Sequence, residues 1–528
     1  MRRYDAPKRR RVITAQDLGQ LEATHDGVIY LEAQDLVTEE AQDRAGWLGL
    51  RFERGNKASP GPEPTLASPG VDTSAAAASV LITGGRILLP GQGLVKADLL
   101  LAEGKVQGLG MKLGPAETQF DAAGLVVAPG IFDPHVHLGL FAPLAEEWVT
   151  EGRSALLGGV TTTGLFMGGS GSHMSRLDEL EQAQGPVDVV PHLVIGDREQ
   201  LAELDAYVAR GVRSFKTYMA GIPGLIEPVD DAFMTDLFSA LAPYAPGVVL
   251  CIHAENASLI DRAKRLWGEK AQDLESWAVT HPPLAEAEAI QRASMLGEEW
   301  GVPTYFVHIS SARGILALRT ARREHAGRLW GETTSPYLGP APPDEAAAKM
   351  MPPLRSVQDK DALWAALADG TLNSIGTDNV TMTRAEKGLE RPFGEVMPGY
   401  PMLGVHLALL LEEGYHRRGV ELDVIMSAVT RQPAEIFGLY PQKGTLLPGS
   451  DADCVVLDLN ESRVVTAAQL ASRSDFAPHA GLTLRGWPVL TLKNGQVTSL
   501  WGQRQEVPGT GRVLLGGERR TEIGPSCV

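Results

Sequence analysis

The sequence has little cysteine, with only three residues among 528, at positions 251, 454 and 527. Their wide spacing excludes a disulfide framework and a cysteine-based metal site, and a reducing compartment fits best. The chain also has no apolar run near the roughly 18 residues of a membrane span. Its charged N-terminal segment is not followed by the apolar stretch of a secretory signal. We therefore expect a cytoplasmic protein that does not bind membranes.

Basic residues are in deficit: 48 Lys and Arg face 65 Asp and Glu, which gives a formal net charge of −17. A general nucleic-acid binder needs a basic face for phosphates, so we expect no nucleic-acid partner. The short basic cluster from Lys8 to Arg11 stands alone and is interpreted as a solvated terminus. The apolar share of 44% and the charged share of 21% are typical of a globular protein.

Residues 1–55 are predicted to form a small α+β extension of uncertain role. VITAQDLGQLEA predicts a helix capped by Thr14, GVIYLEA a short strand, and LVTEEAQDRAGWLG a second helix. Residues 56–78 are rich in Pro, Ala, Ser and Gly, which is the composition of a flexible linker.

Short β-like segments occupy residues 79–130 and return in residues 443–505. Because these two stretches flank a long middle part, they predict one small β-sandwich built from both sides of it. Residues 506–528 are predicted to form a C-terminal tail.

The middle part, residues 131–442, alternates apolar runs with amphipathic helical patterns. Eight such strands and their helices predict a (β/α)8 TIM barrel, in which chemistry takes place at the C-terminal ends of the strands. The fold class is therefore α/β. The runs are IFDPHVHL, VTTTGLFMG, VVPHLVIG, RSFKTYMA, VVLCIHAEN, TYFVHISS, RLWGETTSPYL and NSIGTDNV.

Histidines and one acid stand at several of these strand ends. His135 and His137 are two apart on one strand, so both imidazoles face the same side and could share a metal ion. His253 and His308 end the fifth and sixth runs, and Asp378 ends the eighth. Each alone is also explained as a hydrogen-bonded surface or core residue. Together, at four strand ends of one barrel, they indicate a metal centre.

Lys216 ends the fourth run, where an ammonium would repel a metal ion. If burial deprotonates it, its amine can react with carbon dioxide to form a carbamate, an anionic ligand able to bridge two metals. The alternative is a lysine that extends to the barrel rim.

These residues lie in motifs that resemble the dihydropyrimidinase/hydantoinase (cyclic amidohydrolase) branch of the amidohydrolase superfamily. The resemblance runs from about Ser79 to Val497. The motifs are APGIFDPHVHL, GGVTTT, FKTYMAG, IHAEN, YFVHISSA, PPLR, IGTDN and IFGLYPQKGTLLPGSDADCVVLD.

The resemblance implies two divalent metal ions, zinc or alternatively manganese. One ion would be held by His135, His137, Asp378 and Lys216, the last as N6-carboxylysine. The other would be held by Lys216, His253 and His308. Asp378 would also be the catalytic residue that takes a proton from the attacking hydroxide and passes it to the leaving nitrogen.

The implied activity is hydrolysis of a carbon–nitrogen bond that opens a cyclic amide or imide, in a homotetramer. Allantoinase-like ureide hydrolysis uses the same metal pair and stays open. A catalytically silent scaffold of the same fold is a further alternative, which the intact ligand set disfavours.

Positions that contact substrate in related families differ here. Gly139 replaces the arginine of dihydroorotases, and Gly221 replaces a tyrosine of dihydropyrimidinases. Met351 stands where a serine precedes PPLR, and Gly399 stands where an asparagine is expected. Other residues that could compensate are Tyr218, Tyr337, His173 and Arg176. The ring that is opened is therefore not fixed by these residues.

Residues 1–55 lie outside that resemblance. They are faintly similar to leader regions of some ethanolamine-utilisation and other bacterial microcompartment proteins. The similarity implies docking to a microcompartment shell or cargo partner, and a place inside such a compartment. The alternative is an extra domain at the oligomer interface.

Overall fold

The computed structural model describes residues 12–13, 28–31, 36–38, 42, 51–54, 79–222, 225–325, 328–505 and 510–516. The chain divides into two compact units, Met1–Gly70 and Val71–Val528. Among the described residues, every helix is too short or too polar to span a lipid bilayer.

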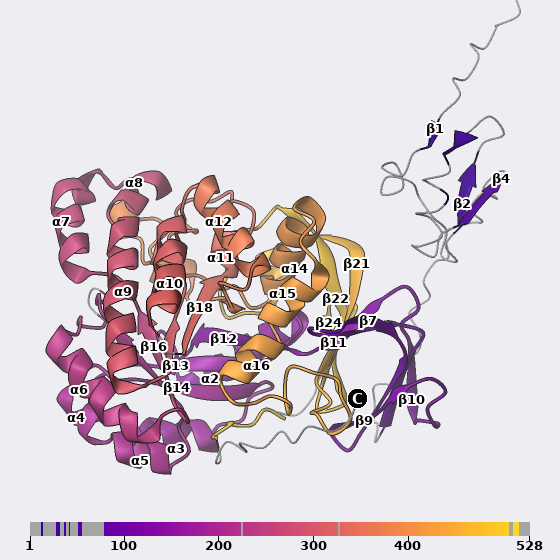
Figure 1. The fold of residues 1–528 in the computed structure, drawn as a ribbon, viewed down its shortest axis with the longest axis horizontal. Coiled ribbons are helices and arrows are strands. Elements are labelled where there is room, and N and C mark those ends of the chain that lie inside the picture. Colours follow the sequence, from indigo (N-terminus) through magenta and orange to yellow (C-terminus); the bar gives the residue numbers. More distant parts are fainter. Residues whose placement is uncertain are drawn as a thin grey trace, which may run out of the picture. The chain divides into compact units, whose positions relative to one another are not determined.

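A parallel sheet that closes on itself forms the centre of the second unit (Figure 1). All eight apolar runs predicted as strands are strands in it, each parallel to the next. They are β12 (Ile131–His137), β13 (Val160–Met167), β14 (Asp188–Val194), β15 (Ser214–Tyr218), β16 (Val249–His253), β17 (Thr304–Phe306), β18 (Leu329–Thr334) and β19 (Ser374–Gly376).

The eighth strand closes the barrel in two pieces. β19 pairs with β18, and the chain then passes through Thr377 and Asp378 into β20 (Asn379–Val380), which pairs with β12. The amide of Asp378 also donates to the carbonyl of His135, at 2.9 Å. The predicted (β/α)8 barrel is thereby confirmed, and its closure brings the ends of the first and eighth strands together.

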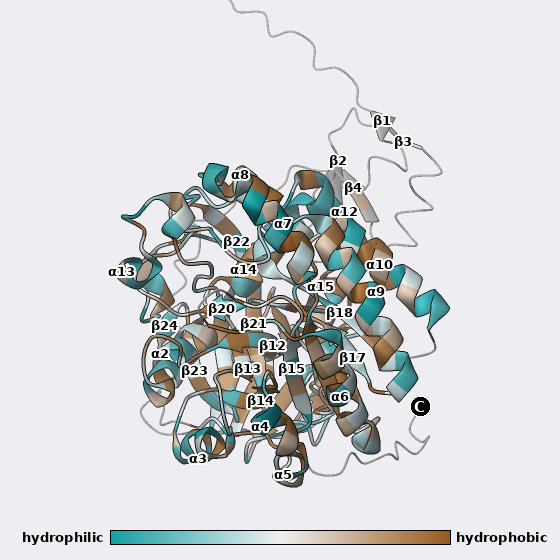
Figure 2. Ribbon diagram, turned by 90° about the vertical axis from the view of Figure 1, so that its left-hand side faces the viewer, coloured by the Kyte–Doolittle hydropathy of each residue, from teal (hydrophilic) through white to brown (hydrophobic). Residues whose placement is uncertain are grey.

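Helices connect the strands and surround the sheet, and Figure 2 shows that they carry both hydrophilic and hydrophobic residues. Several begin at side-chain caps, such as Asp230, Asn256 and Ser311, which accept hydrogen bonds from backbone amides. The helices are α2 (Leu144–Leu157), α3 (Met174–Gln182), α4 (Arg198–Ala202), α5 (Leu204–Ala209), α6 (Asp231–Leu241), α7 (Ala257–Trp267), α8 (Leu274–Val279), α9 (Pro283–Trp300), α10 (Ala312–Glu324), α11 (Ser335–Leu338), α12 (Val357–Ala368), α13 (Arg384–Lys387), α14 (His406–Leu410), α15 (Leu422–Ala428) and α16 (Arg431–Ile436).

A β-sandwich is assembled from segments on both sides of the barrel, as predicted. One sheet has the order β10 (Thr118–Asp121), β5 (Ser79–Thr83), β8 (Asp98–Ala102), β9 (Lys105–Gly110). The other has the order β24 (Gln503–Arg504), β23 (Gln496–Leu500), β22 (Thr483–Lys493), β21 (Cys454–Val464), β11 (Val126–Pro129), β6 (Arg86–Leu89), β7 (Gly93–Lys96). The two sheets share one apolar core, to which Ile82, Leu99, Val127, Val456 and Leu492 belong.

The N-terminal unit corrects part of the prediction. β1 (Val12–Ile13) pairs with β3 (Leu36–Val37), so both expected helices were wrong at their first residues. Three of these four residues are β-branched, which favours strands. The predicted strand is confirmed as β2 (Val28–Leu31), which pairs with β4 (Arg51–Arg54). Thr14, residues 56–78 and Cys527 lie outside the described residues.

The described part of the predicted tail, residues 510–516, runs back to the barrel. Arg512 accepts a hydrogen bond from the amide of Val189, and Leu514 donates to the carbonyl of Val189. Gly511 donates to Gly185 in the same way. This segment therefore lies beside the first residues of β14, at the end of the strand remote from its C-terminus.

Candidate metal centre

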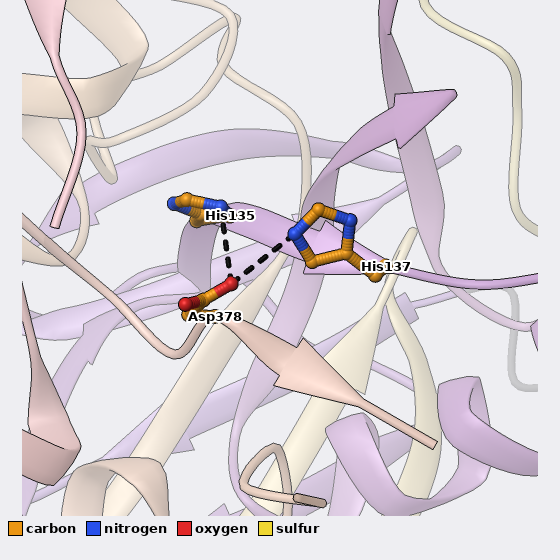
Figure 3. A group of neighbouring side chains, drawn as sticks. All are labelled: His135, His137 and Asp378. Carbon is orange, nitrogen blue, oxygen red and sulfur yellow. Dashed lines mark ion pairs between the residues drawn. The ribbon is translucent and has the colours of Figure 1, made fainter. Parts of the chain in front are cut away.

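His135 and His137 lie on the same side of β12 and face the carboxylate that follows β19. The Nε2 atoms of His135 and His137 are 3.2 and 3.1 Å from Oδ1 of Asp378 (Figure 3). Candidate ligand atoms of all three lie within 4.8 Å of one another. Burial lowers the pKa of His137, which favours the neutral imidazole that binds metals. This triad could hold one metal ion.

A second pair of histidines adjoins this triad. Nδ1 of His253 and Nε2 of His308 are 2.9 Å apart. The rings of His135 and His308 stack with centroids 5.4 Å apart, so the two groups are neighbours. Burial, and then the charge of His253, hold the pKa of His308 well below its ordinary value. The facing nitrogens of this pair could hold a second ion.

Lys216 lies on β15 and is completely buried. Its Nζ has no hydrogen-bond partner among the described residues. The atom lies 4.3 Å from the ring centroid of Phe166 and 4.9 Å from that of Tyr218. Burial lowers the pKa of this amine to about 8. A buried amine without a partner is costly unless something else binds it, and this supports the carbamate interpretation.

Buried acids orient the candidate ligands. Glu332 of β18 accepts from Nδ1 of His135 at 2.7 Å, which leaves Nε2 free to face Asp378. Glu332 also accepts from the Tyr305 hydroxyl at 2.7 Å and from the His308 amide at 3.1 Å. Glu255 is 2.9 Å from Nε2 of His253, which leaves Nδ1 facing His308. Such outer contacts fix the tautomer of a metal-binding histidine.

Asp133 holds the turn that carries Asp378. It accepts from the amide of His135 at 3.1 Å and from the amide and hydroxyl of Thr377 at 3.0 and 2.6 Å. Burial raises the pKa of Asp133 to about 7, although these hydrogen bonds oppose the shift. Asp378 and His308 have positive φ angles of 55° and 40°, so both turns are strained for non-glycine residues.

The orienting acids were not singled out from the sequence. A signal was present, because Glu332 and Asp133 each interrupt an apolar run that becomes a buried strand. An ionisable group in such a run needs a partner, and that partner could have been sought at the neighbouring strand ends.

A cavity of about 500 Å³ opens beside the triad and includes His137 and Asp378 in its wall. Of the predicted substrate contacts, Gly139, Tyr218, Met351 and Gly399 line this cavity. Tyr218 also stacks on the ring of His253, at a centroid distance of 5.3 Å. Those four positions are therefore brought together in the wall of one cavity.

The remaining candidates lie elsewhere, except Arg176, which lines the cavity. Gly221 is outside the lining and packs against the carbonyl of Ile226, where a side chain would collide with it. The buried Tyr337 hydroxyl donates to the carbonyl of Pro352 at 2.8 Å. His173 is buried, and its Nε2 is 2.6 Å from the carbonyl of Val194.

A second acidic group has spacing suitable for a metal but is already neutralised. It consists of Asp188, Asp451 and Asp453. Lys443 lies 2.5, 2.9 and 2.5 Å from these three carboxylates. Because a cation of the chain occupies the space between the acids, this group is an ion-pair cluster.

Comparison with known proteins agrees with this geometry. The profile of the Amidohydrolase family matches residues 346–498. The L-hydantoinase of Paenarthrobacter aurescens is 30% identical over 446 residues, which cover 81% of this chain and 96% of that protein. The D-hydantoinase of Geobacillus stearothermophilus is 31% identical over 447 residues, covering 80% and 93%.

Solved structures show the same relationship. A D-hydantoinase crystal structure superposes with a TM-score of 0.77 at 29% identity, covering 84% of this chain and 100% of the other. The dihydropyrimidinase of Brevibacillus agri gives 0.75 at 28% identity, covering 85% and 100%. The chain therefore belongs to the hydantoinase/dihydropyrimidinase branch of the amidohydrolase family.

Proposed function

We propose that this protein is a metal-dependent hydrolase that opens a cyclic amide or imide ring, as the names of its relatives indicate for them. The observation that carries the proposal is the convergence of polar groups at the barrel strand ends. His135, His137 and Asp378 face one another, and the facing nitrogens of His253 and His308 adjoin them. Folding alone gives no reason to bury such a set in one place.

The residues present fit two divalent ions, zinc or alternatively manganese. Imidazole nitrogen and carboxylate oxygen are suitable ligands for both, and the unpartnered amine of Lys216 fits an N6-carboxylysine that bridges them. Such ions would supply a hydroxide nucleophile at neutral pH and polarise the scissile carbonyl.

Asp378 is the residue that we assign to proton transfer. Its carboxylate lines the cavity beside the triad, so it can reach both an attacking water and the leaving nitrogen. Burial raises its pKa, but His135 and the hydrogen bond from His137 outweigh that effect and hold the pKa below the ordinary range. The carboxylate is therefore ionised, which is the form that a general base needs.

The test is a hydrolysis screen of the purified protein with zinc or manganese added. Hydantoins, dihydropyrimidines, allantoin, other cyclic imides and lactams are compared, and ring opening is followed by mass spectrometry. We expect turnover of at least one cyclic amide, and its loss in metal-stripped protein with recovery on reloading. Absence of turnover on every ring, together with no stoichiometric metal, would instead support a silent scaffold.

We further propose a cytoplasmic homotetramer, with residues 1–55 as an extension joined by a linker over residues 56–78. A microcompartment partner for the extension rests only on sequence similarity. Light scattering of the full chain and of a chain starting at residue 79 tests both the oligomer and the role of the extension.

A further inference from the structure

The cavity beside the metal centre is mainly apolar but contains one basic side chain. Its charged lining residues are Arg176, Glu179 and Asp378, and Asp378 already belongs to the triad. Most of the remaining wall is aliphatic or aromatic. It includes Leu138, Phe141, Leu144, Ile226, Val380 and Met397.

Arg176 is held against the cavity wall by the loop that follows β13. It is the third residue of α3, and its guanidinium lies over Gly169. A Cβ atom at Gly169 would come within 2.4 Å of Nη1 and 2.5 Å of Nη2 of this arginine. Gly169 has a φ of 117°, which favours glycine, and it also lines the cavity.

The charge of Arg176 is not used within the chain. Arg210, at the end of the nearby helix α5, is by contrast paired with Asp178 and Glu181 of α3. Among the described residues, Arg176 has neither a hydrogen bond nor an ion pair within 4.0 Å, although Glu179 lies one turn further on α3. A guanidinium offers a planar fork of donors that matches a carboxylate.

Resting on the proposed hydrolase function, we propose that Arg176 selects substrates whose ring substituent ends in a carboxylate. The ring would face the metal centre, the apolar wall would contact the linking carbons, and the guanidinium would bind the terminal anion. A chain with a formal net charge of −17 repels anions at long range, so such a selection requires a local cation of this kind.

A matched pair of compounds tests the charge alone. Hydantoin with a propionic acid side chain and its primary amide have nearly the same shape, and kcat/KM is measured for both with the metal-loaded full chain. We expect the wild type to prefer the acid about tenfold, with the preference falling at high salt. In Arg176→Met the ratio of kcat/KM for the acid to kcat/KM for the amide should fall to about one.

Two variants serve as controls. Glu179→Gln removes the nearby acid and should increase the preference for the carboxylate compound. Arg198→Met removes an exposed arginine that pairs with Asp236 outside the cavity lining, and should keep the wild-type ratio.

The outcomes separate this inference from the proposed function. Equal hydrolysis of the two compounds by the wild type, or an unchanged preference in Arg176→Met, overturns the role of Arg176 and leaves the hydrolase intact. If neither compound is hydrolysed, the affinities of the acid and the amide are measured by calorimetry, and their ratio tests the role of Arg176. Tighter binding of the acid that depends on Arg176 supports the inference, and equal binding overturns it.

Discussion

Asp378 contacts both imidazoles of the triad through one oxygen, and this gives it two separable tasks. An asparagine at this position keeps a carbonyl oxygen for a metal ion but cannot accept a proton. We therefore expect Asp378→Asn to retain most bound metal and to lose roughly 10²- to 10⁴-fold in kcat. Metal analysis by mass spectrometry and steady-state kinetics check the two parts, and turnover close to wild type would contradict the assignment.

Lys216 allows a second test at the same scale. Lys216→Ala should reduce the metal content below two ions per chain, because it removes the proposed bridging ligand. Acetate or propionate should partly restore metal content and activity by entering the vacated space with a carboxylate. Cys251→Ala is the matched control, since Cys251 is buried beside Lys216 on β16 and burial keeps its thiol neutral, with a pKa of about 12. Full metal occupancy in Lys216→Ala would rule out the carbamate bridge.

The candidate ligands could be predicted because each lies at the end of a strand whose apolar pattern is local in sequence. Their orienting acids could not. Glu332 is 197 residues from His135, and their contact exists only because the barrel closes. Tyr337 lies outside the cavity lining, and its hydroxyl donates to the carbonyl of Pro352, a loop contact that no periodicity in the sequence indicates.

At the scale of elements, a buried lysine anchors the segment that forms one wall of the cavity. Lys387, at the end of α13, donates to the carbonyls of Lys349, Met397 and Gly399, at 3.1, 2.8 and 2.7 Å. Burial, and then the charge of Lys349, lower its pKa to about 7. Met397 and Gly399 line the cavity, so Lys387 links a titratable group to the substrate site.

This arrangement predicts a pH dependence of stability. An unfolded lysine has a pKa near 10.4, so between about pH 7 and 10 the unfolded chain binds more protons at Lys387 than the folded one, and raising the pH favours folding. Relative to Lys387→Met, the free energy of unfolding of the wild type should increase by about 2 kcal/mol between pH 6.5 and 9. This corresponds to roughly 2–4 °C in melting temperature.

Thermal melts of both proteins across this pH range measure the difference, and Lys96→Met, at an exposed position of β7, is the control. If the difference in melting temperature between wild type and Lys387→Met does not change with pH, the three carbonyls keep the ammonium charged. Burial would then not lower the pKa of Lys387.

Strand boundaries show a limit of prediction at this scale. The eighth run was predicted as one strand, but it is interrupted at Thr377 and Asp378, and Asp378 has a positive φ. At the interruption, the amide of Thr377 donates to Asp133 of the neighbouring strand β12. This contact joins residues 244 positions apart and leaves no local pattern.

For the whole molecule, the order of segments along the chain predicted the architecture. Strands from residues 86–129 and 454–504 share the seven-stranded sheet because the barrel between them returns the chain to its starting side. The described part of the C-terminal tail was not predicted to take part, because residues 510–516 have no periodic pattern. Its contacts with β14 are backbone hydrogen bonds and one arginine.

That arginine belongs to the ion-pair cluster, which joins three parts of the molecule. Asp188 comes from the barrel strand β14, Asp453 precedes β21 of the sandwich, and Arg512 comes from the tail. Lys443 lies at the centre, and despite burial its three acidic neighbours hold its pKa above the ordinary value. Removing one partner from a buried cluster leaves uncompensated charges and typically costs about 3–5 kcal/mol.

We therefore expect Lys443→Met to lower the free energy of unfolding by about that amount at pH 7. Lys105→Met, which removes a half-exposed partner of Asp451, should cost less than about 1 kcal/mol.

The difference in stability between wild type and Lys443→Met should become smaller as the pH falls from 7 to 5. In the variant, Lys493 and Arg512 still contact the three carboxylates, but the lost charge of Lys443 leaves an excess of buried negative charge. Protonation of a carboxylate at lower pH relieves this excess. In the wild type, Asp188 and Asp451 stay ionised in this range, because the surrounding cations overcome the effect of burial and hold their pKa below the ordinary value. Melting temperatures of the three proteins measured at pH 7, 6 and 5 decide this, and a gap independent of pH would show that packing, not charge, sets the cost.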